Sequence, residues 1–414
     1  MELVKQLDSY SKQYWDFSGY RNENPLVRYP ATMVAPMQAC IIKEVISSDS
    51  SISNIFDPFF GSGTVLVEAQ KLGLSVIGYD INPLALLLAR VRLEGIPKEK
   101  ASFCVQQLFS RIAMLNGNVN AIVFNNIKKW FRDDVAQSLS VLRQAIIEES
   151  DAQMRRFFWC CFSETVKKYS NTRSSTFKLH IKEKEKIKIM TDESIDFFKS
   201  HVLSQYRLFM REQSVHKEGI NLRCGDSKEL IKQIPDSSID FICTSPPYGD
   251  NQTTVTYGQY SILPILWIDP KDLEIWSPKL IKNFSAIDSM SLGGKRIAKG
   301  NASYNDYIKN ISVEKANKVI SFFADYEDIF SQLTRVLKHG KYMIFTLGNR
   351  RVDNQEVRFD QFNDDLAIKY GMRLDSTITR NIMGKRMPSK VSKIKDIGAV
   401  SSISTEYVKV YRRV

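Results

Sequence analysis

The chain has 414 residues, and its 58 Lys and Arg against 46 Asp and Glu give a net charge of +12. Hydrophobic residues make up 43%, which excludes disorder of the whole chain. The longest apolar run, around Pro83–Ala89, is far too short to span a membrane, and residues 1–17 contain no secretory signal segment. We therefore expect a cytoplasmic protein, and the positive charge is compatible with a polyanionic partner.

Cysteine and histidine usage argues against a disulfide scaffold and against a metal centre. The six Cys residues include the adjacent pair Cys160 and Cys161 but no CxxC pair, so a zinc site built from cysteines is not expected. The four His residues show no ligand spacing. We expect reduced thiols and no bound metal.

Residues 1–96 predict the opening of a doubly wound parallel sheet. A helical pattern near Met37–Ile46 precedes a short apolar strand that runs into the Gly-containing turn of DPFFGSGT. A helix over VLVEAQKLG is expected to end at Gly73, and a second strand, LSVIGYD, ends at Asp80. Such a strand–turn–helix–strand unit is typical of α/β proteins.

Residues 97–218 predict an inserted, mainly helical subdomain. VAQSLSVLRQAIIEE and MRRFFWCCFSETVKKY have helical periodicity, and nothing in this range resembles a further strand–turn–helix unit. The stretch Thr165–Met190 holds eight Lys or Arg and two acidic residues, a local net charge of +6. The insert is therefore expected to be basic.

Residues 219–414 are expected to complete the α/β domain. INLRCGD and SSIDFICTSPPY predict two strands, the second ending in a Pro-Pro turn. A loop-rich region of about 249–310, a helix over YEDIFSQLTRVL and a buried strand in HGKYMIFTLGN follow. The segments MRLDSTITRNI and STEYVKVYRR alternate in polarity and could pair as an antiparallel edge of a mixed sheet.

The turn DPFFGSGT has features of a nucleotide-type binding site. Gly61 and Gly63 allow a tight turn and close approach of a ligand, and Ser62 and Thr64 can hydrogen-bond it or cap the next helix. The helix N-terminus favours a carboxylate or phosphate, although the dinucleotide pattern GxGxxG is absent. Asp80, at the end of the next strand, is well placed for ribose hydroxyls.

One further acidic residue belongs to this hypothesis, and Asp80 itself has an alternative role. Asp226, in CGDS, ends another strand and could bind an adenine amino group. The alternative for Asp80–Pro83 is a helix start at which Asp or Asn serves only as a cap.

The Pro-Pro turn is the candidate catalytic feature. Residues 245–248 follow a buried strand, and the carboxyl ends of strands carry the chemistry in open α/β sheets. The alternative is a rigid surface turn. The exocyclic amine of a nucleobase is a poor nucleophile, and the Ser245 hydroxyl with a carbonyl near Pro246 could accept its hydrogens. Prolines would fix these acceptors, and Tyr248 offers a face for a base removed from a duplex.

The segments DPFFGSGT, IGYDINPLA, CGDS and TSPPYGD together resemble the S-adenosylmethionine-dependent amino-methyltransferases of DNA, over residues 25–95 and 220–413. The resemblance implies a Rossmann-like methyltransferase mixed sheet with an inserted helical subdomain: residues 1–96 and 219–414 as the two halves of one domain, around 97–218. It implies S-adenosyl-L-methionine as cofactor. YPATMVAPMQACII resembles the family's N-terminal cofactor-side segment. The implied cofactor residues are Thr32, Pro36, Asp57, Pro58, Phe59, Phe60, Gly61, Ser62, Gly63, Thr64, Asp80, Ile81 and Asp226, and the implied catalytic residues are Ser245, Pro246, Pro247 and Tyr248.

Ser at the first catalytic position is more typical of cytosine-N4 enzymes of this family, whereas Asp or Asn is typical of adenine-N6 enzymes. We therefore expect methylation of cytosine N4 in double-stranded DNA by base flipping, with adenine N6 as the alternative. The cytosine-C5 class is disfavoured because no Pro-Cys pair occurs. An RNA guanine-N2 methyltransferase and an inactive nucleic-acid-binding subunit remain further alternatives. The resemblance also implies a bacterial or archaeal restriction–modification system with a cognate endonuclease as a possible partner.

Two polar segments are candidate DNA contacts. The loop 249–260 directly follows the catalytic turn, and the segment 170–178 lies in the basic part of the insert. The Lys/Glu alternation at 182–188 favours a solvated face, whereas the basic run 384–395 could clamp phosphate. The alternative for the loop is a polar surface segment without contacts. The candidate DNA-binding residues are Asn251, Thr253, Thr254, Tyr257, Ser170, Asn171, Arg173 and Lys178.

Overall fold

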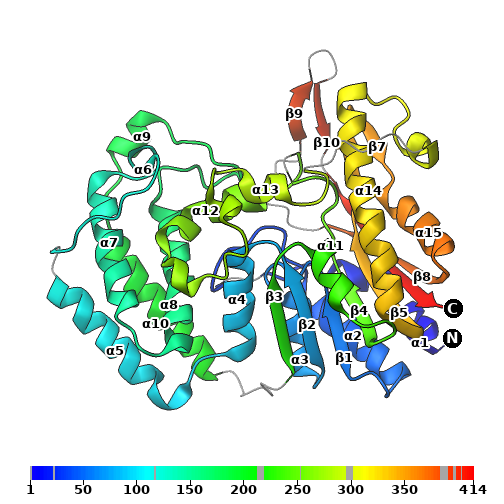
Figure 1. Ribbon diagram of the computed structural model, residues 1–414, viewed down its shortest axis with the longest axis horizontal. Coiled ribbons are helices and arrows are strands. Elements are labelled where there is room, and N and C mark those ends of the chain that lie inside the picture. Colours follow the sequence, from blue (N-terminus) through cyan, green and yellow to red (C-terminus); the bar gives the residue numbers. More distant parts are fainter. Residues whose placement is uncertain are drawn as a thin grey trace.

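The computed structural model describes residues 2–21, 24–115, 118–211, 219–251, 253–294, 302–382, 390–394, 398–401 and 403–414. A seven-stranded sheet forms its centre, in the order β3-β2-β1-β4-β5-β11-β8 (Figure 1). The strands from β3 to β5 run parallel, and β11 is antiparallel to both of its neighbours. The bounds are β1 (Asn54–Asp57), β2 (Ser75–Asp80), β3 (Ile220–Cys224), β4 (Ile239–Thr244), β5 (Leu337–Leu347), β8 (Met372–Asn381) and β11 (Thr405–Arg413).

This sheet confirms the predicted α/β class and Rossmann-like mixed sheet. The two C-terminal segments do pair as antiparallel strands, because β11 inserts between β5 and β8. Two small antiparallel pairs complete the β-structure: β6 (Arg350–Val352) with β7 (Gln355–Val357), and β9 (Lys390–Ile394) with β10 (Gly398–Ser401). The basic run 384–395 lies only partly within the described residues, since 383–389 and 395–397 are outside them.

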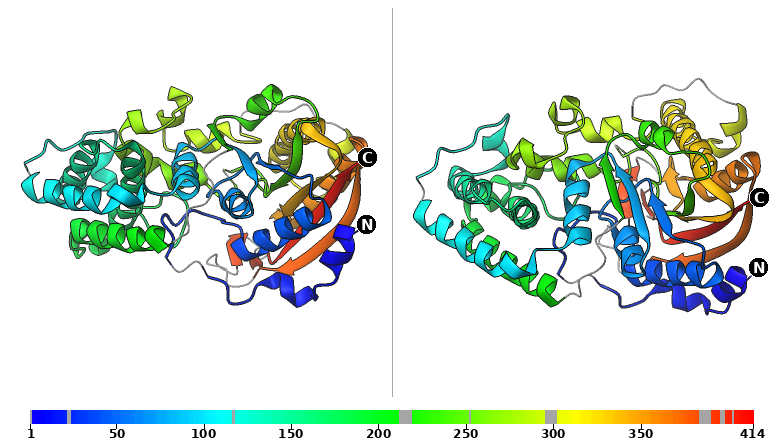
Figure 2. Two further views of the ribbon diagram at one scale, coloured as in Figure 1. Left: turned by 90° about the horizontal axis from the view of Figure 1, so that it is seen from below. Right: turned by 60° about the horizontal axis from the view of Figure 1, so that its bottom comes forward.

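Helices cover both faces of the sheet (Figure 2). One face is covered by α2 and α3, with α4 beside them, and the other by α11, α14 and α15. Central strands are therefore apolar on both faces: Ile55 and Phe241 belong to one core, Phe56 and Ile242 to the other. The bounds are α2 (Ala35–Ser48), α3 (Thr64–Lys71), α4 (Pro83–Glu94), α11 (Ser227–Leu230), α14 (Val313–Val336) and α15 (Phe359–Lys369).

The chain between β2 and β3 adds a helical layer beyond α4, seen at the left of Figure 1. The helices expected at 135–149 and 154–169 are confirmed as α7 and α8. Helix α8 is nearly all buried, from Phe157 to Val166, and it contacts α4, α7, α10 and α12. The bounds are α5 (Lys98–Leu115), α6 (Ile127–Trp130), α7 (Asp133–Ile147), α8 (Ala152–Tyr169), α9 (Lys184–Lys188) and α10 (Ser194–Arg211).

The expectation of a loop-rich region at 249–310 is wrong for its early part, residues 257–267, which form helix α12 (Tyr257–Trp267). This helix is apolar on all sides and is buried between α4 and α8, so it lacks the polar face that reveals an amphipathic helix. Pro264 inside it adds a misleading loop signal. The remaining short elements are α1 (Glu2–Asp8), α13 (Ala286–Met290), η1 (Lys12–Asp16), η2 (Ile231–Gln233), η3 (Pro270–Asp272), η4 (Pro278–Ile281) and η5 (Ala302–Tyr307).

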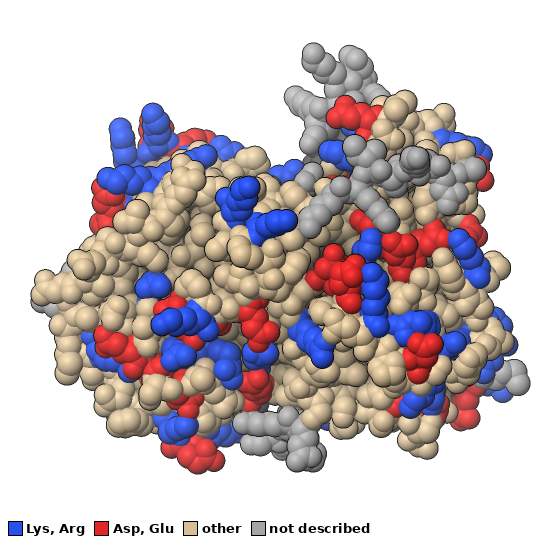
Figure 3. Space-filling model, viewed as in Figure 1, with Lys and Arg blue, Asp and Glu red and all other residues tan. Residues whose placement is uncertain are grey.

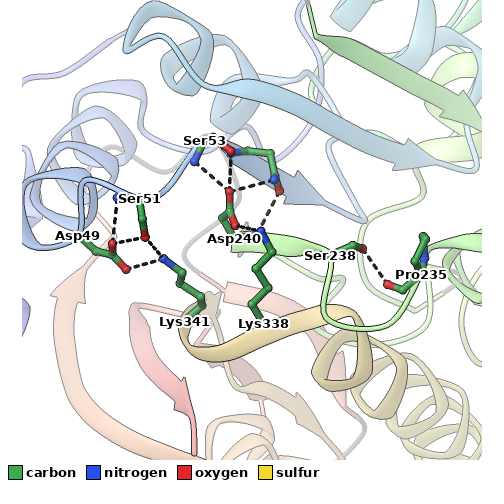
Figure 4. Close-up of polar contacts among 9 residues, drawn as sticks. Asp49, Ser51, Ser53, Pro235, Ser238, Asp240, Lys338 and Lys341 are labelled. Carbon is green, nitrogen blue, oxygen red and sulfur yellow. Dashed lines mark hydrogen bonds and ion pairs between the residues drawn. The ribbon is translucent and has the colours of Figure 1, made fainter.

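A buried carboxylate ties the amino ends of the central strands together (Figure 4). Asp240, at the start of β4, accepts from the backbone and side chains of Ser53 and Asn54 at 2.8–3.2 Å, and from Lys338 Nζ at 2.6 Å. Burial opposes ionisation, yet these donors together hold the pKa of Asp240 below its usual value. This network lies at the edge of the sheet opposite the turns described below.

Within the described part of the chain, no helix is long and apolar enough to cross a membrane. Among the same residues, no three His, Cys, Asp or Glu side chains gather as a metal site.

Candidate active site

The glycine turn (residues 57–64) follows β1 and leads into α3. Gly61 and Gly63 have φ angles of +52° and +77°, which glycine adopts without strain. The Gly61 N–H donates to Asp80 Oδ2 at 2.9 Å, so the turn is fastened to the end of the adjacent strand β2. Gly63 is the N-cap of α3. Because glycine has no side chain, no N-cap side chain accepts a hydrogen bond from the first backbone N–H groups of the helix.

Asp80 has both carboxylate oxygens engaged by backbone N–H groups. Oδ2 accepts from Gly61 and Oδ1 accepts from Asn82, each at 2.9 Å. Burial raises the pKa of Asp80 to about 6, although these hydrogen bonds act in the opposite direction. Each oxygen keeps a further lone pair, so the carboxylate can accept two more hydrogen bonds from a vicinal diol.

Helix capping at this point is performed by Asn82. Its Oδ1 accepts from the Leu84 N–H at 3.1 Å, at the start of α4. Its Nδ2 donates to the Tyr29 hydroxyl at 3.0 Å and to Ser261 Oγ at 2.7 Å. The N-terminal segment and α12 are thus held against the end of β2, and Asp80 is not used as the cap of α4.

The side chains of Ser62 and Thr64 do not cap α3, contrary to one of the two roles expected for them. Both are buried, and their hydroxyls lie 3.1 Å apart. Arg92 of α4 donates to the Ser62 carbonyl at 2.5 Å and to Thr64 Oγ1 at 3.4 Å. The Ser62 carbonyl and the Thr64 hydroxyl therefore hold the glycine turn against α4.

Asp57 joins the glycine turn to the Pro-Pro turn (residues 245–248). Its Oδ1 accepts from the Thr244 hydroxyl at 2.6 Å and from the Phe59 N–H at 3.0 Å. The carboxyl group is 1% exposed, and burial raises its pKa to about 7. Because β1 and β4 are adjacent parallel strands, the two turns meet at one edge of the sheet. Pro58, also buried, accepts from the Ser227 hydroxyl through its carbonyl at 2.6 Å.

The Pro-Pro turn brings a serine and a tyrosine hydroxyl together. Ser245 Oγ and Tyr248 Oη are 3.3 Å apart, and the tyrosine also donates to Glu406 Oε1 at 3.1 Å. The Tyr248 ring lies against Gly348, just after β5, where an added Cβ would sit 2.6 Å from the ring. Burial and the nearby Glu406 raise the pKa of Tyr248 well above its usual value, so the phenol stays protonated.

The chain after the Pro-Pro turn is held by Arg350, which the sequence did not single out. Its guanidinium pairs with Asp250 at 3.0 Å and donates to Thr253 Oγ1 at 2.7 Å, with both charged side chains less than 8% exposed. Thr253 and Thr254 also donate to Asp250. These contacts hold Asp250, Thr253 and Thr254 in place beside Arg350.

The other predicted contacts of this segment are partly enclosed. Asn251 is 4% exposed, and its Oδ1 has no hydrogen-bond partner. Tyr257 is the first residue of α12 and stacks on Tyr29 with 5.9 Å between ring centroids. Asp288, a second residue that sequence analysis missed, accepts from the Gly258 and Gln259 N–H groups at 2.8 and 2.9 Å and so caps α12. Thr253 is exposed, and Thr254 is half-buried.

The remaining cofactor candidates flank the glycine turn. Asp226 is half-buried, and its carboxylate caps α11 by accepting from the Lys228 N–H at 3.0 Å. The Ile81 carbonyl accepts from the indole N–H of Trp276 at 3.0 Å, an aromatic side chain that was not predicted here. Thr32 is exposed, and Pro36 stands in the first turn of α2. Phe59 and Phe60 are half-buried and buried, respectively.

In the insert, the structure separates the four predicted DNA contacts into two pairs. Ser170 and Asn171 are 0% and 4% exposed and bond to neighbouring protein groups, so direct contacts of theirs with DNA are not supported. Arg173 and Lys178 are exposed. Figure 3 shows Lys and Arg side chains at the end of the insert where α9 lies, with acidic side chains among them.

Residues 3–90 match the DNA methylase family of N6 and N4 methyltransferases. Over 413 residues the chain is 30% identical to the type II methyltransferase M.MvaI of Kocuria varians, covering 92% of this chain and 88% of that protein. It is 22% identical to the type II methyltransferase M.BsoBI of Geobacillus stearothermophilus over 90% of this chain and 83% of that one.

Solved structures with local likeness include a putative DNA modification methylase from Thermus thermophilus complexed with S-adenosyl-L-methionine. It is 16% identical, has a TM-score of 0.23 and covers 46% of this chain and 53% of its own. An rRNA methyltransferase of Streptomyces viridochromogenes is 11% identical, with a TM-score of 0.30 over 92% of this chain and 86% of its own. TM-scores this low do not establish a shared fold, and the fold is assigned from the order of the strands in the sheet.

Proposed function

Since the chain belongs to the S-adenosylmethionine-dependent DNA amino-methyltransferases of the N4/N6 family, we propose that it methylates the N4 amine of cytosine in double-stranded DNA. The observation that carries this choice of base is Ser245 at the first position of the Pro-Pro turn, where adenine-N6 enzymes of the family typically have Asp or Asn. The type II relatives further support a role in a restriction–modification system, with a cognate endonuclease as a possible partner.

The glycine turn and its surroundings fit S-adenosylmethionine, which supplies an electrophilic methyl group when bound. Asp80 keeps acceptor capacity for two ribose hydroxyls. The N-terminus of α3 at Gly63 favours the carboxylate of the methionine part. Asp226 and Ile81 lie at the ends of β3 and β2, beside Asp80, where the adenine ring would be held. The role of Thr32 and Pro36 as cofactor contacts is proposed from the resemblance alone.

The protein's own groups would prepare the target amine. The exocyclic nitrogen is delocalised into the base and becomes nucleophilic when its lone pair leaves the plane of the ring. Ser245 Oγ and the carbonyl of Pro246 are acceptors for its two hydrogens, and the proline rings keep these acceptors fixed. The target base must leave the duplex to reach them, and the Tyr248 ring offers it a stacking face.

DNA contacts are proposed for the exposed members of the predicted set. Thr253 lies a short way after the Pro-Pro turn, whereas Arg173 and Lys178 lie on the insert, ahead of α9. In Figure 1 α9 and the β9–β10 pair lie on the two sides of the edge at which the parallel strands end. DNA lying across this edge would bring its backbone near both.

The test is the identity of the methylated base. Purified protein is incubated with methyl-labelled S-adenosylmethionine and unmethylated genomic DNA, and the digested nucleosides are analysed by mass spectrometry. N4-methylcytosine is the expected product. N6-methyladenine would keep the family but overturn the assignment of the base from Ser245. Label in an RNA control, with none in DNA, would refute the DNA substrate.

A further inference from the structure

A chain of hydrogen bonds leads from the Pro-Pro turn to a buried arginine. Ser245 Oγ lies 3.3 Å from Tyr248 Oη, which is 3.1 Å from Glu406 Oε1 on β11. The other carboxylate oxygen, Oε2, accepts from Arg380 Nη1 of β8 at 2.7 Å. Arg380 is 5% exposed, and its Nε donates to the Trp15 carbonyl of η1 at 3.0 Å. The four side chains come from three separate parts of the polypeptide.

The chemistry of these groups allows only one donor-to-acceptor direction along the hydrogen-bond chain. An ionised carboxylate only accepts hydrogen bonds, and the guanidinium of Arg380 only donates. The single hydroxyl hydrogen of Tyr248 is therefore committed to Glu406. Between Tyr248 and Ser245 the tyrosine oxygen can then only accept, so the hydrogen of Ser245 must point to it. Both lone pairs of Ser245 Oγ are left free on its other side.

We infer that Glu406, held by Arg380, is a positioning residue that fixes the Ser245 hydroxyl as a hydrogen-bond acceptor for the target amine. This inference rests on the proposed function, in which Ser245 accepts a hydrogen from the amine. A serine hydroxyl without this constraint could also donate to the ring nitrogen of cytosine, which would hold the base without directing the lone pair of its amine. Glu406 selects between these two arrangements through Tyr248.

The packing around the chain limits other arrangements. Gly348 lies directly against the Tyr248 ring, so the phenol cannot move toward β5 without a clash. The Trp15 and Asp16 carbonyls of η1 accept from Arg380, and the Asp16 carboxylate accepts from the Asn381 N–H at 2.7 Å. The N-terminal segment thereby supplies the acceptors for Arg380, the last side chain of the hydrogen-bond chain. Neither Glu406 nor Arg380 reaches the target base; both act through Tyr248.

The test compares three variants with wild type by single-turnover methyl transfer to unmethylated genomic DNA. Glu406→Gln introduces an amide that can donate to the tyrosine oxygen and so permits the reversed chain. Tyr248→Phe keeps the ring but removes the link. Asp364→Asn is the matched control: Asp364 of α15 accepts from the Tyr411 hydroxyl at 2.7 Å and pairs with Lys409 at 2.8 Å, both on β11 as well.

The expected result is a fall in rate of roughly tenfold or more for Glu406→Gln and for Tyr248→Phe, with unchanged affinity for S-adenosylmethionine. The double variant should be no slower than Tyr248→Phe alone, because both changes break one chain. Asp364→Asn should retain the wild-type rate. The inference is overturned if Tyr248→Phe is as fast as wild type, if the two losses simply add, or if Asp364→Asn is as slow as Glu406→Gln. Absence of DNA labelling by the wild-type protein would instead refute the proposed function.

Discussion

Asp80 gives the sharpest prediction about cofactor binding. In the wild-type protein the two carboxylate oxygens of Asp80 accept from the backbone N–H groups of Gly61 and Asn82. In Asp80→Asn the side-chain NH2 group replaces one of these oxygens and must face one of the two N–H groups, donor against donor. The variant also loses the charged acceptor for the ribose hydroxyls. A hydrogen bond to a charged group contributes about 1.5–3 kcal/mol, so we expect a total loss of about 3 kcal/mol. This corresponds to a roughly 100-fold rise in the Kd for S-adenosylmethionine.

The same residue predicts how binding depends on pH. The pKa of Asp80 is raised by burial to about 6, and the ionised form is the one that accepts from ribose. Calorimetric titration with S-adenosylmethionine should therefore give a Kd about tenfold higher at pH 5 than at pH 7. The pH dependence of folding stability has the opposite sign. Because the pKa of Asp80 is raised in the folded protein, the contribution of this group to the free energy of unfolding is full in acid and is lost as the pH rises through about 6. An unchanged Kd in Asp80→Asn, or a wild-type Kd that does not vary between pH 5 and 7, would refute the assignment of Asp80.

Three further changes test the scaffold around the site. Asp57→Asn removes a buried carboxyl group with a pKa of about 7. The wild-type protein should lose about 2.5 kcal/mol of stability between pH 5 and 8 through this group, and thermal melts of the variant should show little of this loss. Arg350→Met leaves Asp250 without its ion pair and removes the donor that holds Thr253, so kcat/KM for DNA should fall roughly tenfold while calorimetry shows unchanged cofactor binding. Asp240→Asn should lower the free energy of unfolding by about 2 kcal/mol at neutral pH, measured with urea, and the deficit should shrink in acid because the pKa of Asp240 is lowered in the folded protein. Equal stability of this last variant and wild type at pH 7 would contradict the role of the Asp240 network.

The features that the sequence predicted are those encoded by neighbouring residues. The glycine turn, Asp80 and the Pro-Pro turn each follow a short apolar strand, so their position at one edge of the sheet follows from parallel pairing alone. The helices at 135–149 and 154–169 were also predictable, because their apolar residues recur at helical spacing.

The features that were missed depend on contacts between distant residues. Glu406 meets Tyr248 across 158 positions and Arg350 meets Asp250 across 100, and no local pattern marks either partner. Helix α12 was missed because it is apolar on every side. Ser170 and Asn171 looked like contact residues by composition, yet the turn after α8 buries them against Lys167, Thr172 and Lys129. Burial of polar side chains of this kind is decided by the tertiary structure.

The central claim is that the Pro-Pro turn directs methyl transfer to cytosine N4, and one measurement tests it most directly. Wild type and Ser245→Ala are each given S-adenosylmethionine and unmethylated DNA in a single turnover, and the methylated nucleosides are quantified by mass spectrometry. We expect N4-methylcytosine from wild type and a roughly 100-fold slower reaction from the variant, whose cofactor affinity is unchanged. Production of N6-methyladenine by wild type, or a wild-type rate in Ser245→Ala, would contradict the claim.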